Sequence, residues 1–305
     1  MDIIFASVSF VAGGLLAVQA GANGQLSKTT GSPFTATLMQ LSVGAVALVL
    51  IALLTGSLIA LAEVRHATWW HALGGTASAL YVVSTILLFP RLGAVVSVGL
   101  FIAGQMLASF LIDGYGLLGV PVQPIDARVV AGTAGVLGGT VAIVLGQRGA
   151  LGELSASKLG WVVLALLAGA VLPVQGAVNG LLRADIGAPF TVGAVSFLVA
   201  TLSMAAVLLL VLALGQPKPD LGQLGDMPWW GWLGGFVGAF YVTTVFTAIP
   251  VIGTAATVGL TVAGQQIASV FVDSYGWFRL PVRPVSRLRL AGVAAVLAGV
   301  ALIKM

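Results

Sequence analysis

The sequence has no cysteine, and charged residues make up only 7% of its 305 positions. Without cysteine there is no disulfide framework and no thiolate metal site. Soluble domains carry roughly a quarter charged residues, so a water-soluble fold of this length would lack the charge to cover its surface. The scarcity of charge therefore predicts that the solvent of this protein is lipid.

The net charge of +4 is small and does not indicate a nucleic-acid-binding protein. No stretch forms a basic domain, and the basic residues stand in short loops between apolar runs, as in the cytoplasmic loops of membrane proteins. The two histidines, His66 and His71, fall in or beside a loop. We expect them to be solvated or interfacial side chains rather than metal ligands.

Residues that carry chemistry are also missing from the apolar runs. None of these runs has an Asp, Glu, Lys, Arg or His deep inside it, whereas proton-driven exporters usually keep such a group mid-membrane. An intramembrane hydrolase would need a buried base or a metal site, and an ATPase would need a phosphate-binding loop. We therefore expect a protein that is not an enzyme and that binds neither a cofactor nor a metal.

Hydrophobic residues make up 59% of the chain and predict an all-α, polytopic membrane protein. A bilayer core of about 30 Å takes about 20 helical residues to cross. The first run follows Met1-Asp2 with no positive charge before it, so it is interpreted as a spanning helix and not as a signal peptide. Ten transmembrane helices are expected, at 3–26, 33–55, 70–89, 93–112, 127–146, 158–182, 189–214, 230–249, 253–272 and 288–304.

One polar stretch occurs twice and organises the chain. Residues 104–116 (GQMLASFLIDGYG) return at 264–276 (GQQIASVFVDSYG), with seven of thirteen positions identical. Other pairs match as well: the amides of Gln19 and Asn23 with those of Gln175 and Asn179, and the third-helix tyrosines Tyr81 and Tyr241. The chain is therefore a tandem repeat, with predicted domains 1–150 and 151–305.

Each repeat has five spans, so the second enters the membrane from the opposite side, as in many secondary transporters. The loops on one face collect nine basic residues and those on the other face collect four, which predicts that the first face is cytoplasmic and both termini lie outside. The first set is Lys28, Arg91, Arg148, Lys158, Lys218, Arg279, Arg283, Arg287 and Arg289; the second is Arg65, Arg128, Arg183 and Lys304.

The duplicated stretch places polar side chains four residues apart, in one line along an otherwise apolar helix. At about 1.5 Å per residue, the glutamine lies about 12 Å deeper than the aspartate. A glutamine at that depth must face protein or water. Two interpretations stay open, hydrogen bonding between helices and the lining of a cavity; the duplication favours the lining. The candidates are Gln105 and Ser109, and Gln265 and Ser269.

The first helix of each half adds an amide pair on one face, Gln19 with Asn23 and Gln175 with Asn179. Pro173 precedes Gln175 and is expected to free a backbone carbonyl, and interrupted helices with polar side chains at mid-depth indicate a transport site. The third helices contribute Tyr81, beside Ser78 and Thr85, and Tyr241, beside Thr244. Their tyrosines either close a cavity or hydrogen-bond across helices.

Asp113 and Asp273 end the duplicated stretch, each followed by a small residue and Tyr-Gly. They are either coupling acids or turn residues that accept backbone N–H groups. The turn interpretation is favoured because both lie at helix ends. Arg287 or Arg279 is a further expected partner of Asp273.

Together these motifs resemble the YdcZ-like family, a branch of the drug/metabolite transporter superfamily. The resemblance covers both halves and rests on the 104–116 stretch, the Gly31-Ser-Pro-Phe-Thr turn, the first-helix amides, the Trp-Trp…Gly-Gly…Tyr third helix and the Pro-x-x-Pro loop. It implies a fused pair of antiparallel five-helix units in a bacterial inner membrane, ten helices around a central cavity, and alternating access. Small multidrug members have a first-helix glutamate; the nearest polar positions here are Gln19 and Gln175, so that coupling role does not carry over.

The leading hypothesis is a secondary transporter of a small organic solute, with its site between the repeats. Amide-only polarity favours a neutral or weakly charged, hydrogen-bonding solute. A passive channel and a non-transporting membrane scaffold are the alternatives. The expected partners are the solute and the lipid bilayer, with no nucleic acid, and the chain is a monomer or a homodimer.

Overall fold

The computed structural model describes residues 2–92, 94–146, 158–279, 282 and 285–304. These parts of the chain form ten long helices and no strand. Each helix matches one of the ten expected runs, so the all-α prediction is confirmed. The helices are α1 (Asp2–Thr30), α2 (Pro33–Leu54), α3 (Thr76–Leu92), α4 (Ala94–Tyr115), α5 (Ala127–Leu145), α6 (Leu159–Ile186), α7 (Pro189–Ala213), α8 (Leu233–Ile252), α9 (Thr254–Tyr275) and α10 (Arg287–Lys304).

Nine segments of the described chain are long and apolar enough to cross a membrane. The tenth helix, α10, differs because its 18 residues include Arg287, Arg289 and Lys304. These basic residues lie in its first and last turns, and every residue between Arg289 and Lys304 is apolar. Its charges therefore sit at the ends of a spanning helix.

The repeated Gly-x-Pro-Phe-Thr motif makes the turn from the first to the second helix of each half. Gly31 has φ +65° and Gly187 has φ +70°, a left-handed conformation that glycine adopts without strain. In the first half the Ser32 hydroxyl accepts a hydrogen bond from the Thr35 N–H at 3.2 Å. Proline follows in the first helical turn of α2 and α7, where its missing N–H costs nothing.

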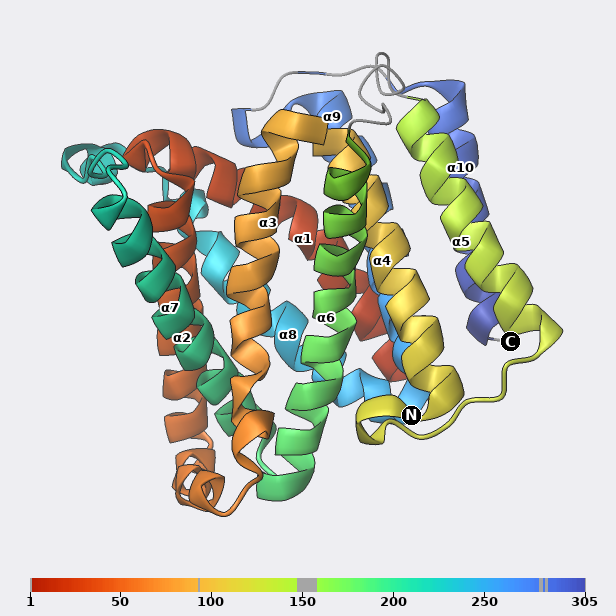
Figure 1. Cartoon of the computed structure of the whole chain (residues 1–305), viewed down its shortest axis with the longest axis horizontal. Coiled ribbons are helices and arrows are strands. Elements are labelled where there is room, and N and C mark those ends of the chain that lie inside the picture. The colour runs from red at the N-terminus through yellow and green to blue at the C-terminus, as the bar shows by residue number, and fades with distance from the viewer. Residues whose placement is uncertain (1, 93, 147–157, 280–281, 283–284, 305) are drawn as a thin grey trace.

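The two halves exchange their first helices. α1 packs along α8 and α9 of the other half, and α6 packs along α3 and α4. Two pairs of equivalent helices also meet, α2 with α7 at one edge of the bundle and α5 with α10 at the other (Figure 1). The main contacts of one half thus recur in the other, as two inverted five-helix repeats require.

Glycines bring the exchanged helices into backbone contact. A Cβ added at Gly264 of α9 would overlap the carbonyl oxygen of Phe10 in α1, and one at Gly13 would overlap that of Thr261. The equivalent crossing joins α6 to α4, where a Cβ at Gly104 would overlap the Leu166 carbonyl. Small residues allow this approach between membrane helices, and it fixes how deep the polar residues of one half lie against the other.

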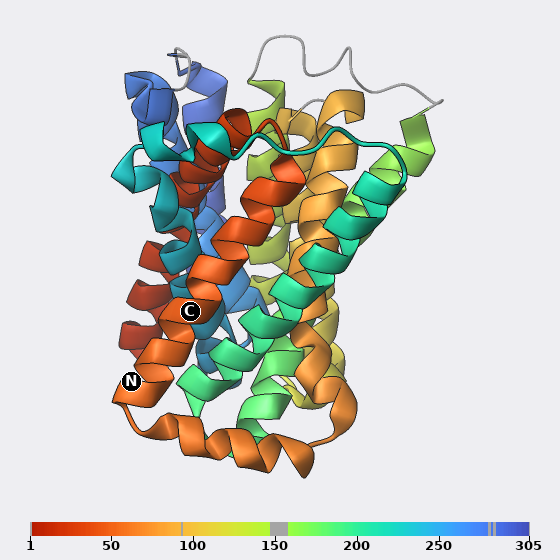
Figure 2. The same ribbon diagram turned by 90° about the vertical axis from the view of Figure 1, so that its left-hand side faces the viewer.

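Two features differ from the expectations. The expected loop at 56–69 is mostly a 3₁₀ helix, η1 (Ser57–Arg65), followed by η2 (Trp69–Gly75); Figure 2 shows η1 lying across the end of the bundle. Pro173 lies inside a continuous α6. The predicted domain junction at 150, with Arg148 and Arg283, lies outside the described residues.

Candidate functional site

On α6 the predicted amides lie buried between helices and are paired. Gln175 exchanges two hydrogen bonds with Ser78 of α3, one from the serine hydroxyl to Oε1 at 3.2 Å and one from Nε2 to the hydroxyl at 2.8 Å. Asn179 donates from Nδ2 to the hydroxyl of Ser196 on α7 at 3.0 Å. Its Oδ1 lies against Gly74 and has no hydrogen-bond partner in the described structure. These bonds hold α3, α6 and α7 together.

On α1 the equivalent amides, Gln19 and Asn23, are half-buried, and Gln19 faces a glycine. A Cβ at Gly238 of α8, the counterpart of Ser78, would lie 2.8 Å from the Gln19 Nε2. Gln40 of α2 is buried against Gly234 of α8. Among the described residues, nothing hydrogen-bonds the buried Oδ1 of Asn23 or the buried Nε2 of Gln40.

The difference between the two clusters has a chemical cause. Where the α6 cluster has the Ser78 hydroxyl, the α1 cluster has only the hydrogen of Gly238. Each buried polar group left without a partner costs about 1–3 kcal/mol. In the α1 cluster, defined here as Gln19, Asn23 and Gln40, Gln19 therefore lacks the partner that Gln175 has, whereas the Oδ1 atoms of Asn23 and Asn179 are alike in having none among the described residues.

Gln40 was not among the residues predicted from the sequence. The second repeat offered the only signal, because the offset of 156 that aligns the first helices also aligns Gln40 with Ser196. Both are buried polar residues inside very apolar helices, at positions where an aliphatic side chain would be expected.

The two predicted tyrosines lie on the third helix of each half. The Tyr81 ring packs on Phe101 of α4, with centroids 5.2 Å apart, and Tyr241 is buried on α8 near Thr261 of α9. Phe101 and Thr261 are equivalent positions, so each tyrosine lies against the same site of its own half.

The duplicated stripe runs along the same faces. Gln105 follows Phe101 by one helical turn, and Gln265 follows Thr261 in the same way, so each glutamine lies on the helix face that touches a tyrosine. Gln105 is buried and Gln265 half-buried. The serines are bonded within their own helices: Ser109 donates to the Gln105 carbonyl at 2.7 Å, and Ser269 to that of Gln266 at 2.8 Å.

Asp113 caps a helix of the other half. Its Oδ1 accepts a hydrogen bond from the Thr254 N–H at 2.7 Å, and its Oδ2 accepts one from Ala255 at 2.6 Å. The turn interpretation correctly expected backbone N–H donors, but these belong to the start of α9 and not to the turn after α4. Gly116 of that turn takes the expected positive φ, +62°.

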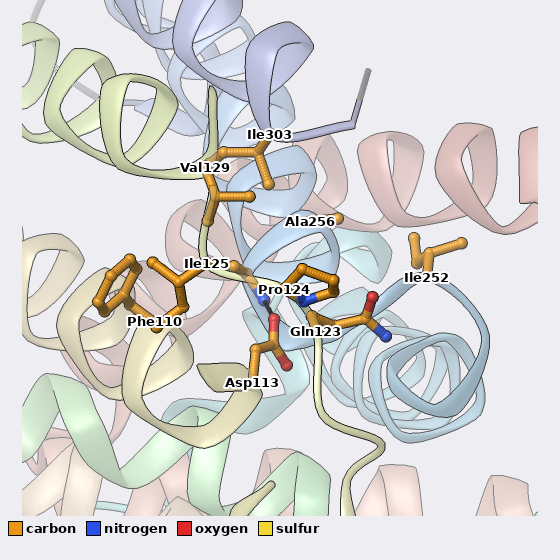
Figure 3. A pocket seen from close by; sticks show the side chains of 10 residues that line it. Phe110, Asp113, Gln123, Pro124, Ile125, Val129, Ile252, Ala256 and Ile303 are labelled. Atoms are coloured by element: carbon orange, nitrogen blue, oxygen red, sulfur yellow. Dashed lines mark hydrogen bonds between the residues drawn. The ribbon is translucent and has the colours of Figure 1, made fainter. Parts of the chain in front are cut away.

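A small pocket of about 80 Å³ opens beside this carboxylate. Figure 3 shows Asp113 pointing toward the start of α9, with Gln123 and Pro124 beside it and Val129 across the pocket next to Ile303. The pocket lies at the end of the bundle that carries both chain ends (Figure 1).

Asp273, the equivalent of Asp113, is paired differently. Its Oδ2 lies 2.7 Å from Nη2 of Arg289, which is itself buried on α10. The same nitrogen donates to the Ser269 hydroxyl at 3.2 Å. The expectation that Arg287 or Arg279 would be its partner is therefore wrong: both are exposed, whereas position 289 faces α9.

His71 was expected to be solvated or interfacial, and the structure corrects this. It is buried in η2, with Nδ1 2.6 Å from Oδ2 of Asp185 at the end of α6. The equivalent positions hold Gly231, in the second half, and Thr29, in the first half. The burial of His71 could not be predicted from the composition of the loop, because it results from η2 folding back onto α6. The described residues contain no group of three His, Asp or Glu side chains that would hold a metal ion.

Removing this pair is expected to weaken the contact between η2 and the end of α6. Asp185→Ala should lower the free energy of unfolding by about 1–2 kcal/mol, because a charge-assisted hydrogen bond contributes about that much and Asp185 is partly exposed. Chemical denaturation in detergent would measure the loss. His66→Ala, at an exposed histidine, is the control; an equal loss in both variants would contradict the structural role of the pair.

The chain matches a family in both halves. The family model described as "Putative inner membrane exporter, YdcZ" covers residues 4–142 and 160–302. A solved structure titled "Crystal structure of protein" superimposes with a TM-score of 0.69 and 18% sequence identity, covering 99% of this chain and 95% of that one. At that identity the likeness concerns the fold alone. No curated protein matches the sequence.

Proposed function

Since this chain belongs to the YdcZ family of inner-membrane exporters through both of its halves, we propose that it is a secondary transporter that moves a small organic solute by alternating access. The observation that carries the proposal is the α1 cluster, where the buried Oδ1 of Asn23 and the buried Nε2 of Gln40 have no hydrogen-bond partner among the described residues. In lipid such groups are costly unless something bonds them. A bound solute would supply those bonds.

The proposed site lies where the two repeats meet. It takes the α1 cluster and the two tyrosines as its centre, with the glutamine stripes leading away from it. Gln19 lies about 16 Å along α1 from its end at Thr30, at the helical rise of 1.5 Å per residue, so the site is deep in the bilayer. Its residues are Gln19, Asn23, Gln40, Tyr81, Gln105, Ser109, Gln175, Asn179, Tyr241, Gln265 and Ser269.

Amides and hydroxyls both donate and accept hydrogen bonds but carry no charge. A site made of them favours a neutral or weakly charged solute with several polar groups, and it disfavours a permanent cation. Because Gln175 is paired with Ser78 whereas Gln19 faces Gly238, the solute is expected to contact mainly α1, α2 and α8 in this conformation.

The proposal predicts that a bound solute stabilises the protein through these residues. In a solute screen by thermal unfolding, a ligand at about 100 times its Kd adds about 2.7 kcal/mol. Asn23→Leu, and Gln105→Leu combined with Gln265→Leu, should weaken the binding of any such solute about tenfold, the size of a lost hydrogen bond to a buried group. Gln223→Leu, at an exposed glutamine, should leave it unchanged.

Uptake into proteoliposomes then separates the alternatives. A transporter gives saturable flux that falls in the same variants, and unchanged flux of a confirmed solute would refute the site. A passive channel gives flux that does not saturate. The scaffold alternative is favoured by one observation, the pairing of Gln175 and Asn179 between helices, and it predicts that no solute shifts the unfolding temperature.

A further inference from the structure

The two equivalent aspartates hold unlike partners, and the difference sets their chemistry apart. Asp273 faces a cation of its own half, Arg289, across 2.7 Å. Asp113 faces two backbone N–H groups of the other half. The position equivalent to Arg289 in the first half is Val129, which lines the pocket beside Asp113 (Figure 3).

The start of α9 is shaped to receive the carboxylate. Its cap residue, Gly253, has no side chain to satisfy the first N–H groups and has φ +83°. A Cβ at Gly253 would lie only 3.2 Å from Oδ2 of Asp113. Asp113 therefore takes the place of a capping side chain, and its negative charge suits the positive end of the helix dipole. We call this contact between Asp113 and α9 the latch.

The latch joins helices that an alternating-access motion must separate. It connects α4 of the first half to the α8–α9 turn of the second half at the bundle end that carries both termini. If α4 and α9 separate there, the carboxylate loses both N–H donors and its interaction with the positive end of the α9 dipole. Asp273 keeps its countercharge in a similar motion because Arg289 belongs to the same half.

A carboxylate stripped of its partners beside the apolar groups of this pocket is costly to keep charged. Other charged and titratable groups stand on the elements around the pocket. Asp126 already caps α5, accepting hydrogen bonds from the N–H groups of Arg128 and Val129. The remaining groups are Asp2 on α1, Tyr115 on α4, Arg128 on α5 and Lys304 on α10, the last with its side chain outside the described part.

We propose that Asp113 is the proton-carrying residue of this transporter and that protonation opens the latch. A proton from the aqueous phase at that membrane face bonds to the carboxylate, the acid becomes neutral, and the hydrogen bonds from Thr254 and Ala255 break. Closing the latch returns the proton to water. The coupling of this step to solute movement rests on the proposed function; the latch itself does not.

The test measures the latch directly and needs no solute. The chain has no cysteine, so Tyr115→Cys with Val251→Cys, at the exposed ends of α4 and α8, gives a single spin-labelled pair. Electron–electron double resonance in lipid nanodiscs reports the distance between the labels. As the pH falls from about 8 to about 5, the open-to-closed ratio should rise by up to tenfold per pH unit, the limit for one linked proton.

Two variants make the result specific. Asp113→Asn cannot carry the negative charge and should show the open distance at every pH. Gly253→Ala keeps the acid but crowds it, and should also favour the open distance. Asp220→Asn, an exposed aspartate that caps only its own loop, should retain the response of the unsubstituted pair.

The outcomes separate the two proposals. A distance that does not respond to pH in the unsubstituted pair would overturn proton carriage, even if Asp113→Asn opens the latch, since Asp113 would then be a fixed cap. A pH response that survives in Asp113→Asn would overturn its assignment to this residue. Neither result depends on whether a solute is ever found.

Discussion

Replacing Gly264 with alanine is expected to leave little folded protein in the membrane. The added Cβ would overlap the Phe10 carbonyl oxygen, a backbone atom that cannot rotate away. Relief requires α1 and α9 to move apart along their whole contact. Overpacking of this kind costs about 1–3 kcal/mol or more, a large share of the 5–15 kcal/mol that stabilises a typical protein.

The loss should exceed that of an ordinary core substitution because the crossing is not isolated. A Cβ added at Gly13 would overlap the Thr261 backbone in the same contact. Gly104 and Gly169 make the equivalent crossing of α4 and α6. A separation at Gly264 therefore also pulls α1 away from the α1 cluster's partners on α8. Gly104→Ala should fail in the same way for the same reason, which tests the symmetry.

Gly138→Ala provides the matched control. Gly138 is also a helical glycine, on α5, but nothing lies within 4 Å of an added Cβ there. Alanine is favoured over glycine by about 1 kcal/mol in a helix, so this variant should be at least as stable as the unsubstituted protein. Size-exclusion chromatography of the solubilised protein measures folded yield, and equal yields for Gly264→Ala and Gly138→Ala would contradict the crossing.

The sequence predicted those parts of the fold that depend on local pattern. Apolar runs long enough for a bilayer located the ten helices, and the duplicated stretch identified the inverted repeat. Gly31 and Ser32 marked a helix turn because a positive φ and a capping hydroxyl are local requirements. Periodicity also placed Gln19 with Asn23 on one helix face.

Local sequence pattern could not predict which residues from distant parts of the chain contact each other. Asp113 reaches the start of α9, 141 positions along the chain, and only the exchange of helices between halves brings the two together. His71 meets Asp185 because η2 folds onto α6. Gln40 is notable because no neighbour among the described residues hydrogen-bonds its Nε2. That Gly238 offers Gln19 no hydroxyl can be recognised only when the two clusters are compared in space.

The second large effect is expected at Arg289. Arg289→Met should lower the free energy of unfolding by about 3 kcal/mol, the low end of the cost of breaking a buried ion pair. The low end applies because Asp273 keeps 24% of its side chain exposed while Arg289 keeps only 5%. The methionine fills the space, but Asp273 is left with its charge and without its partner, and Ser269 loses a donor.

Removing the second charge should restore most of that stability. In Asp273→Asn combined with Arg289→Met the orphaned charge is gone, and replacing a whole buried pair by well-packed neutral groups is often neutral or better. A double-mutant cycle from chemical denaturation measures the coupling, which should be of the same order as the single loss. Additive losses would show that Arg289 and Asp273 act separately. Recovery would identify Arg289 as the countercharge of Asp273 within its own half, a partner that Asp113 lacks.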